Sequence, residues 1–501
     1  MLLVFVGCTT LGPDYEEPAV SWLDDWQTDL YGQVVDPEQQ QAADLAFWWQ
    51  LFDDPVLNDL IDTVKRDNLT LQTAGLRILE SRAVLGIAGA ARYPQLQQVS
   101  GAVTYVNSRE RGSGAADGDG GLTAYQGNFD LGWELDFWGR FRRGIESADA
   151  AYFTSVASQQ DVQVLLSAQA ADLYYAYLTT LLRIDIARRN ADIQRRSLEI
   201  TQQLFDGGQN SELDVQQART QYLGTLSTIP SLEITLANVR NALAALLGRP
   251  PAEIAELSGL PQSLPIVDPI ELGGFPAELL TRRPDIRAAA WQVATQSAQI
   301  GIARADYYPA ISLVGTLGWS GTDVDGTPDV SNVGFGPAFN WNVFDYGRIR
   351  NNVRLQDARL EQLITIFQDQ VLQAAREIDD AAIAVVKTRE RQEVLIASAA
   401  SAERALDLAN TRYREGYSDF QRVLDAQRAF FNATEQELVN QGNHIAAIIG
   451  FYKAVGGGWS AMSLEEMLPE SVRERMTTRT NWGELLEEPV PDVYQQGSSS
   501  P

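Results

Sequence analysis

The longest stretches without a helix-breaking residue set the first constraint on this chain. Neither glycine nor proline occurs in residues 145–206 or 348–415, which are runs of 62 and 68 residues. Ordinary globular helices rarely exceed about 25 residues. At 1.5 Å per residue, each run would form a helix about 90–100 Å long. In the second run, apolar residues spaced alternately four and three apart predict a coiled-coil seam along Leu360, Ile364, Phe367, Val371, Ala374 and Ile378.

The two glycine-free runs belong to a duplicated unit. The first run ends at Gly207 and Gly208, and the second ends at Gly416, which lies 208 positions after Gly208. An amphipathic segment precedes each run and a helical segment follows it, and these four segments are residues 56–92, 211–247, 276–307 and 419–455. A duplication of helix, β-hairpin, very long helix, tip turn and helix is the simplest account.

A β-hairpin is predicted between the first two helices of each unit. The four expected strands occupy residues 95–108, 125–137, 310–321 and 332–344. Each is about as long as a tilted membrane strand, which needs roughly 9–11 residues. In the second strand, Phe129, Leu131 and Trp133 alternate with polar residues. The apolar face therefore suits lipid, and a half-buried strand of a globular sandwich is the alternative interpretation.

The second strand of each hairpin is expected to switch directly into a long helix. Aromatic residues at this point suit a membrane–water interface, and glycine permits the tight change of direction. The arginine after each glycine would lie among lipid headgroups, or would be an ordinary first-turn helix residue. The residues of the two switches are Phe137, Trp138, Gly139, Arg140, Phe344, Tyr346, Gly347 and Arg348.

Composition excludes several function classes. A formal net charge of −27 argues against nucleic-acid binding and suits solubility or the attraction of cations. A single cysteine and a single histidine rule out an internal disulfide and argue against a metal site built on these residues. We find no phosphate loop and no nucleophile motif, and His444 is expected on a helix surface. The chain is therefore predicted to be neither an enzyme nor a cofactor protein.

The first residues indicate a targeting signal. The stretch "MLLVFVGC" resembles the end of a truncated signal peptide with a lipobox, so Cys8 would carry a covalent lipid such as palmitate. An incidental thiol is the alternative. No stretch has the ~18 apolar residues that a membrane-spanning helix needs. Four strands cannot close a barrel, and an open strand edge in lipid leaves backbone groups unpaired, so the chain is expected to oligomerise.

With both units placed, the chain resembles the TolC-like outer-membrane factors, most closely the NodT/OprM-type efflux lipoproteins. The resemblance runs from Cys8 to about Trp459 and is carried by several stretches in family order. These are "CTTLGPDYEEP", "WELDFWGRFRR", "LLTRRPDIRAAAWQ", "ARADYYPAISL", "RYREGYSDFQRVLDAQR" and "FYKAVGGGW".

The resemblance implies a mainly helical homotrimer with a 12-stranded outer-membrane β-barrel, four strands from each chain. The barrel would continue into a long periplasmic α-helical barrel with a mixed equatorial domain. Residues 1–8 would be the signal and lipobox, and residues 483–501 a disordered tail. The structural repeats would be residues 56–248 and 276–456, with hairpins at 95–137 and 310–344, and the equatorial segments residues 9–55, 249–275 and 457–482.

The implied function is passive conduction from an inner-membrane pump and a periplasmic adaptor to the exterior. The pump would be of the resistance-nodulation-division type, and the cargo would be drugs and amphiphiles. A lipid-anchored location in the outer membrane follows. An exit duct for secreted polypeptides and a structural coiled-coil scaffold are the alternatives.

The resemblance also implies a gate at the periplasmic helix tips. Tyr413 would donate a hydrogen bond to Asp214 of the first repeat, and Asp425 would face the pore. Gln421 stands where these lipoproteins tend to carry an apolar constriction residue, and Arg422 where some members have a second acid. We therefore expect a more polar constriction than in the family.

Overall fold

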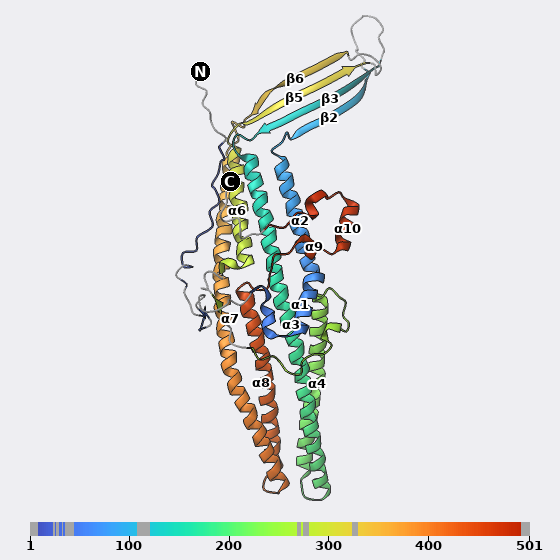
Figure 1. Cartoon of the computed structure of the whole chain (residues 1–501), viewed down its shortest axis with the longest axis vertical. Coiled ribbons are helices and arrows are strands. Elements are labelled where there is room, and N and C mark those ends of the chain that lie inside the picture. Colours follow the sequence, from blue (N-terminus) through green and yellow to red (C-terminus); the bar gives the residue numbers. More distant parts are fainter. Residues whose placement is uncertain are drawn as a thin grey trace. The chain divides into compact units, whose positions relative to one another are not determined.

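A computed structural model of the chain describes residues 9–23, 26, 30–32, 34–35, 45–107, 121–267, 272–273, 280–322 and 329–491. It divides into two compact units. The first contains residues up to Ala19, Ile78–Ser155 and Ala288–Gln368, and the second contains Val20–Arg77, Val156–Arg287 and the residues from Asp369 onward. Figure 1 shows the elements of both.

The first unit contains a four-stranded antiparallel sheet in the order β2-β3-β5-β6 (Figure 1). Its strands are β2 (Leu96–Val106), β3 (Leu122–Leu135), β5 (Ala310–Gly321) and β6 (Val330–Asn340). All four strands expected from the sequence are present, with ends shifted by a few residues in three of them. The two hairpins join through β3 and β5, where Leu135 pairs with Ile311 and Tyr125 with Gly321.

The outer strands of this sheet each have one partner among the described residues. β2 pairs with β3, and β6 pairs with β5. Many apolar side chains of β6 are exposed, among them Val333 at 79 % and Phe339 at 77 %. Two apolar edges thus remain available for further pairing.

The helices reproduce the predicted duplication. Helices α3 (Arg140–Asp206) and α7 (Arg348–Arg414) both have 67 residues, and α4 (Glu212–Leu246) and α8 (Phe420–Ala454) both have 35. The shorter helices are α1 (Pro55–Asp67), α2 (Leu69–Ala90), α6 (Pro284–Ala305), α9 (Leu464–Met467) and α10 (Glu470–Arg479). The described ranges also contain short elements: η1 (Leu45–Phe52), η2 (Ala255–Leu257), η3 (Gly483–Leu486), β1 (Val34–Val35), β4 (Leu272–Gly273) and helical residues 280–282. No helix in the described ranges is both long enough and apolar enough to cross a membrane.

One predicted helical segment is in fact two helices. The amphipathic segment expected over residues 56–92 breaks at Asn68, between α1 and α2. The Asn68 side chain accepts hydrogen bonds from the backbone N–H groups of Thr70 and Leu71 and donates one to the carbonyl of Leu246. Asparagine favours such local capping over a continuous helix. The second such segment is also interrupted: residues 280–282 are helical, Arg283 is not, and α6 begins at Pro284. Residues 274–279, where its expected start at 276 falls, lie outside the described residues.

Aromatic contacts join η1 and α1 to α3 and α8 in the core of the second unit. Trp48 stacks on Tyr452 with ring centroids 5.5 Å apart, and Phe52 contacts Tyr175 at 5.0 Å. The Tyr174 hydroxyl donates to the Asp54 carboxylate at 2.7 Å, while Asp54 also caps α1. These contacts fix η1 and α1 against α3 and α8.

The C-terminal segment after α8 packs along α3. The carbonyl of Gly458 accepts a hydrogen bond from Ser167, and a Cβ on Gly458 would lie only 2.5 Å from the Ser167 hydroxyl. Glycine is therefore required at this approach. Ordered structure also continues past the predicted limit at residue 482, because η3 follows and Leu486 is buried. The disordered tail expected from residue 483 is thus wrong for residues 483–486.

Candidate functional site

The two helix tips are built alike. Gly208 after α3 and Gly416 after α7 adopt left-handed φ angles of +72° and +80°. In each tip the following residue closes the turn, with Gln209 N–H bonding to Leu204 O and Tyr417 N–H to Arg412 O, both at 2.8 Å. This is the helix C-terminal motif that favours glycine. The predicted tip glycines Gly208 and Gly416 are equivalent, whereas Gly207 lacks a left-handed φ.

The predicted gate bond joins different residues from those expected. The Tyr413 hydroxyl accepts a hydrogen bond from the Asn210 side chain at 2.5 Å. Asp214 instead accepts hydrogen bonds from the Ser211 N–H and hydroxyl, at 3.3 and 3.0 Å. The predicted bond between Tyr413 and Asp214 is therefore corrected. Asp214 is the third residue of α4, where its carboxylate completes a capping box with Ser211, and this leaves Asn210 to bridge the repeats.

An apolar cluster holds the two tips together. Phe420, Val423 and Leu424 of α8 and Ala218 of α4 are all at most 3 % exposed. Tyr413 packs on this cluster, with its ring centroid 5.3 Å from that of Phe420. Beside it a groove of about 330 Å³ runs between α3, α7 and α8, lined by Ile193, Arg196, Ser197, Ile200, Asn410, Tyr413, Arg414, Phe420 and Val423.

The exposed face of α8 carries the other two predicted gate residues. Gln421 donates from its amide to the Asp425 carboxylate at 3.1 Å, one helical turn away. Arg428 lies 3.6 Å from the same carboxylate and donates to Gln221 of α4 at 2.7 Å. Gln421 and Asp425 thus form one polar strip, and Arg428 offsets part of the charge of Asp425. The sequence reasoning missed Asn210 and Arg428. Arg428 could have been found from its i,i+3 spacing to Asp425.

An aspartate caps the long helix at each strand-to-helix switch. Asp136 accepts hydrogen bonds from the N–H groups of Phe141 and Arg142, both at 3.0 Å. Asp345 does the same for Gly347 and Ile349. These backbone N–H groups lower the pKa of Asp345, and Arg348 adds to the effect. Gly139 and Gly347 have φ angles of +73° and +90°, as the predicted change of direction requires.

Tryptophans tie the hairpins to the preceding helices. The indole N–H of Trp133 donates to Arg92 O at 3.1 Å, and that of Trp341 donates to Tyr307 O at 3.0 Å. Trp133 and Trp341 again lie 208 positions apart. The contact recurs in both repeats, so it fixes each hairpin to its helix in the same way.

The interface residues expected at the switches divide into two groups. Phe344 and Tyr346 are almost fully exposed, and Phe137 is exposed as well. Trp138 is half-buried, because it stacks on Tyr308 at 4.5 Å and donates to Pro309 O. Arg140 lies 3.5 Å from Asp306 and 4.0 Å from Glu134, so it forms ion pairs within the chain. Arg348 is exposed at the start of α7.

The segment after Cys8 is held firmly to the first unit. Arg143 donates to Leu11 O at 3.0 Å and to Asp14 at 2.7 Å, and its side chain is only 5 % exposed. Gly12 and Gly301 touch so closely that a Cβ on Gly12 would lie 2.5 Å from the Gly301 Cα. Cys8 itself lies outside the described residues.

Comparison with known proteins identifies the family. A profile described as outer membrane efflux protein matches residues 60–249 and 275–457, which are the two repeats. The chain belongs to the outer membrane efflux protein family. The membership confirms the predicted relationship and agrees with the expectation of a non-enzymatic channel in the outer membrane.

Relatives of this outer membrane efflux protein support the same conclusion. The solvent efflux pump outer membrane protein SrpC of Pseudomonas putida is 30 % identical over 471 residues, 92 % of this chain and 97 % of SrpC. The probable outer membrane lipoprotein SilC of Salmonella typhimurium is 28 % identical, over 91 % of this chain and 97 % of SilC. These relatives match nearly the whole efflux protein.

A solved structure confirms the fold of this efflux protein. The outer-membrane channel OprN is 32 % identical, with a TM-score of 0.80 over 90 % of this chain and 99 % of that one. The predicted combination of long helices with four strands per chain is therefore confirmed. The chain is an outer-membrane component of efflux and serves as its exit duct. Its gate residues and lipid stay predictions.

Proposed function

We propose that three copies of this chain form the exit duct of a tripartite pump, which passes small amphiphilic molecules across the outer membrane. The observation that carries the assembly is the sheet with two open edges, at β2 and β6. Three such sheets, joined edge to edge, close a barrel of twelve strands without unpaired backbone groups. The exposed apolar side chains of the strands then face lipid.

The partners are a periplasmic adaptor and an inner-membrane pump of the resistance-nodulation-division type. The adaptor would engage the helix tips, where the groove between α3, α7 and α8 joins apolar Ile200 and Phe420 to the exposed arginines Arg196 and Arg414. An amphipathic helical hairpin with acidic flanks matches this surface, because its apolar face fills the groove while its acids pair with the arginines. Contacts at this place act directly on the gate.

In the resting duct, Asn210 and Tyr413 hold the two repeats together at the tip. Their hydrogen bond lies on the apolar cluster that contains Phe420, and both side chains are partly buried. A neutral hydrogen bond contributes about 0.5–1.5 kcal/mol, so three copies supply only a few kcal/mol. Adaptor binding can provide a free energy of this size and so shift the duct to an open state.

The cargo class and the anchor rest on the relatives. SrpC belongs to a solvent pump, and SilC is named as a lipoprotein. A small-molecule cargo fits the name of SrpC, and acylation of Cys8 fits the name of SilC. A lipid on Cys8 would add to the hold of the barrel, since one acyl chain alone binds a membrane marginally.

The test is efflux in cells that lack their own outer membrane efflux proteins. The chain is expressed with its neighbouring pump and adaptor, and retention of ethidium is measured. The chain should lower ethidium retention only when both partners are present. Gly416→Val should abolish this effect, because a φ angle of +80° is strained for a β-branched residue. Gly224→Ala serves as the control, since a Cβ at Gly224 would have no neighbouring atom within 4 Å. Efflux that persists without the adaptor would contradict the proposal.

A further inference from the structure

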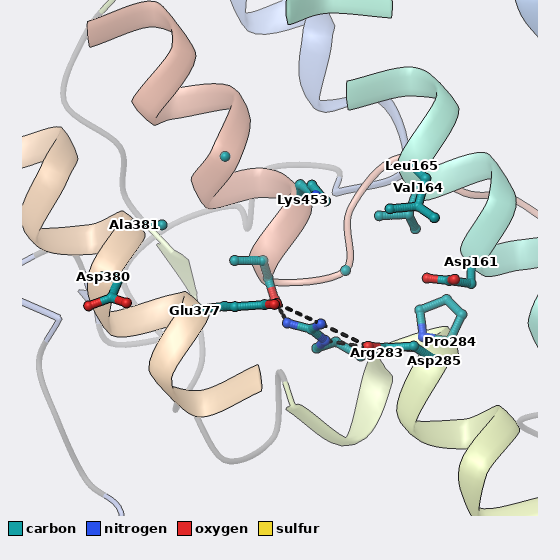
Figure 2. A pocket seen from close by; sticks show the side chains of 13 residues that line it. Asp161, Val164, Leu165, Arg283, Pro284, Asp285, Glu377, Asp380, Ala381 and Lys453 are labelled. Atoms are coloured by element: carbon teal, nitrogen blue, oxygen red, sulfur yellow. Dashed lines mark hydrogen bonds and ion pairs between the residues drawn. The ribbon is translucent and has the colours of Figure 1, made fainter. Parts of the chain in front are cut away.

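A charged cavity lies in the second unit, away from the tips. It measures about 520 Å³ and opens between α3, the start of α6, α7 and the end of α8 (Figure 2). Four carboxylates and two cations line it, namely Asp161, Asp285, Glu377, Asp380, Arg283 and Lys453. The charges of these groups do not balance, because the acids outnumber the bases by two.

Arg283 pairs with two of the four carboxylates that line the cavity. Its guanidinium donates to both oxygens of Asp285, at 3.1 and 2.8 Å, and to Glu377 at 3.0 Å. It also donates to Ala454 O at 2.7 Å, at the C-terminal end of α8. Figure 2 shows this guanidinium held between Asp285 and Glu377, with Asp161 beyond Pro284.

The carboxylate of Asp161 on α3 also lines the cavity but does not pair with Arg283. Within the described ranges no donor or cation lies within bonding distance of its carboxylate, although Lys453 lines the same cavity. Burial raises the pKa of Asp161 to about 6, and the charges of Asp285 and Glu377 add to this, against the opposing effect of Arg283 and Lys453. The remaining carboxylate facing the cavity, Asp380, is exposed on α7.

The cavity joins the two repeats of the chain. Asp161 belongs to the first repeat, whereas the other charged groups belong to the second. We propose that this cavity is an acid-responsive joint, in which protonation of Asp161 tightens α3 against α6, α7 and α8 and so favours the closed duct. At neutral pH the carboxylate of Asp161 faces that of Asp285 without a partner and loosens the same contact.

The direction in which stability changes with pH follows from the difference in proton binding between the folded and the unfolded chain. The folded chain binds the Asp161 proton more tightly than the unfolded chain does, because burial raises the pKa of Asp161 from 3.8 to about 6. Stability should therefore rise as the pH falls from about 7 through 6 toward 4. For a chain of this length, this corresponds to a rise in melting temperature of about 2–3 °C.

The test compares wild type with Asp161→Asn, which fixes the side chain in an uncharged form. Melting temperature of the detergent-solubilised protein is measured from pH 5 to 8. The Asp161 carboxyl should make wild type melt about 1–1.5 °C higher at pH 5 than at pH 8, because the full 2–3 °C is reached only near pH 4. Asp161→Asn should lose this part of the difference, while Asp172, whose pKa burial also raises to about 6, keeps its own part. Asp161→Glu should keep the Asp161 part. Asp380→Asn is the matched control, with the same charge change at an exposed position of the cavity.

A second readout locates the effect and links it to the duct. Hydrogen exchange in peptides covering residues 156–168, corrected for intrinsic rates, should slow at pH 5 in wild type alone. In planar bilayers wild type should open less often at pH 5.5 than at pH 7.5, and Asp161→Asn should open rarely at both. This last arm rests on the proposed function, whereas melting and exchange do not. If the melting temperature of Asp161→Asn depends on pH as strongly as that of wild type, the proposed joint is disproved.

Discussion

Removal of the Arg283 side chain should destabilise the second unit measurably. Arg283→Met keeps the apolar stem but takes away every hydrogen bond to Asp285, Glu377 and Ala454 O. Breaking a buried ion pair costs about 3–5 kcal/mol. Here the two carboxylates are 35 % and 49 % exposed, so water screens them and the cost falls to about 2–3 kcal/mol. The lost bond to the helix end adds about 1 kcal/mol.

In a chain of this length, 1 kcal/mol corresponds to a shift of about 1 °C in melting temperature. Arg283→Met should therefore melt about 3–4 °C below wild type, as followed by circular dichroism in detergent at pH 7.5. Arg283→Lys should recover part of this, because it restores the charge without the planar fork. Arg376→Met is the control, since Arg376 is an exposed arginine on α7 beside Glu377. Equal melting of Arg283→Met and wild type would refute the reasoning.

Three further predictions concern the tip and the anchor. Tyr413→Phe removes the acceptor of the Asn210 hydrogen bond in all three copies and should raise a low open probability in planar bilayers at least about tenfold, as expected for a loss of a few kcal/mol; unchanged gating would place closure elsewhere. Asp425→Asn should weaken block by divalent cations only a few-fold, because Arg428 already offsets that charge; a block as strong as in wild type would contradict a pore-facing Asp425. Cys8→Ser should abolish palmitate labelling and leave the protein in the outer membrane, and labelling that persists would disprove the assignment of Cys8.

The repetitive parts of the fold could be predicted from the sequence. Absence of glycine and proline predicted the long helices, which the structure shows as α3 and α7. Alternation of apolar residues predicted the strand at residues 125–137, because a period of two depends only on the local backbone. The position of the hairpin in each repeat predicted the other three strands. Glycines 208 positions apart predicted the matched helix ends, since the left-handed φ at Gly208 and Gly416 strongly favours glycine.

Contacts between distant segments could not be predicted in the same way. The Asn210 partner of Tyr413 depends on how the two tips approach, which no local pattern records. The Asn68 amide that caps α2 also donates to the carbonyl of Leu246, 178 positions away, and no local pattern indicates that partner. The Arg283 cluster joins three segments whose proximity follows only from the packed helices. The family resemblance predicted where the gate lies. The hydrogen bond found there joins Tyr413 to Asn210 rather than to Asp214.

Single-channel recording of the purified protein tests the central claim most directly. The chain is extracted in detergent, shown to be a trimer by native mass spectrometry, and added to a planar lipid bilayer. A duct closed at its tips should give discrete conductance steps of one size with low open probability, and Tyr413→Phe should raise the open time without changing the size of the step. A stable trimer that inserts into the bilayer and conducts no ions under either condition would contradict the account.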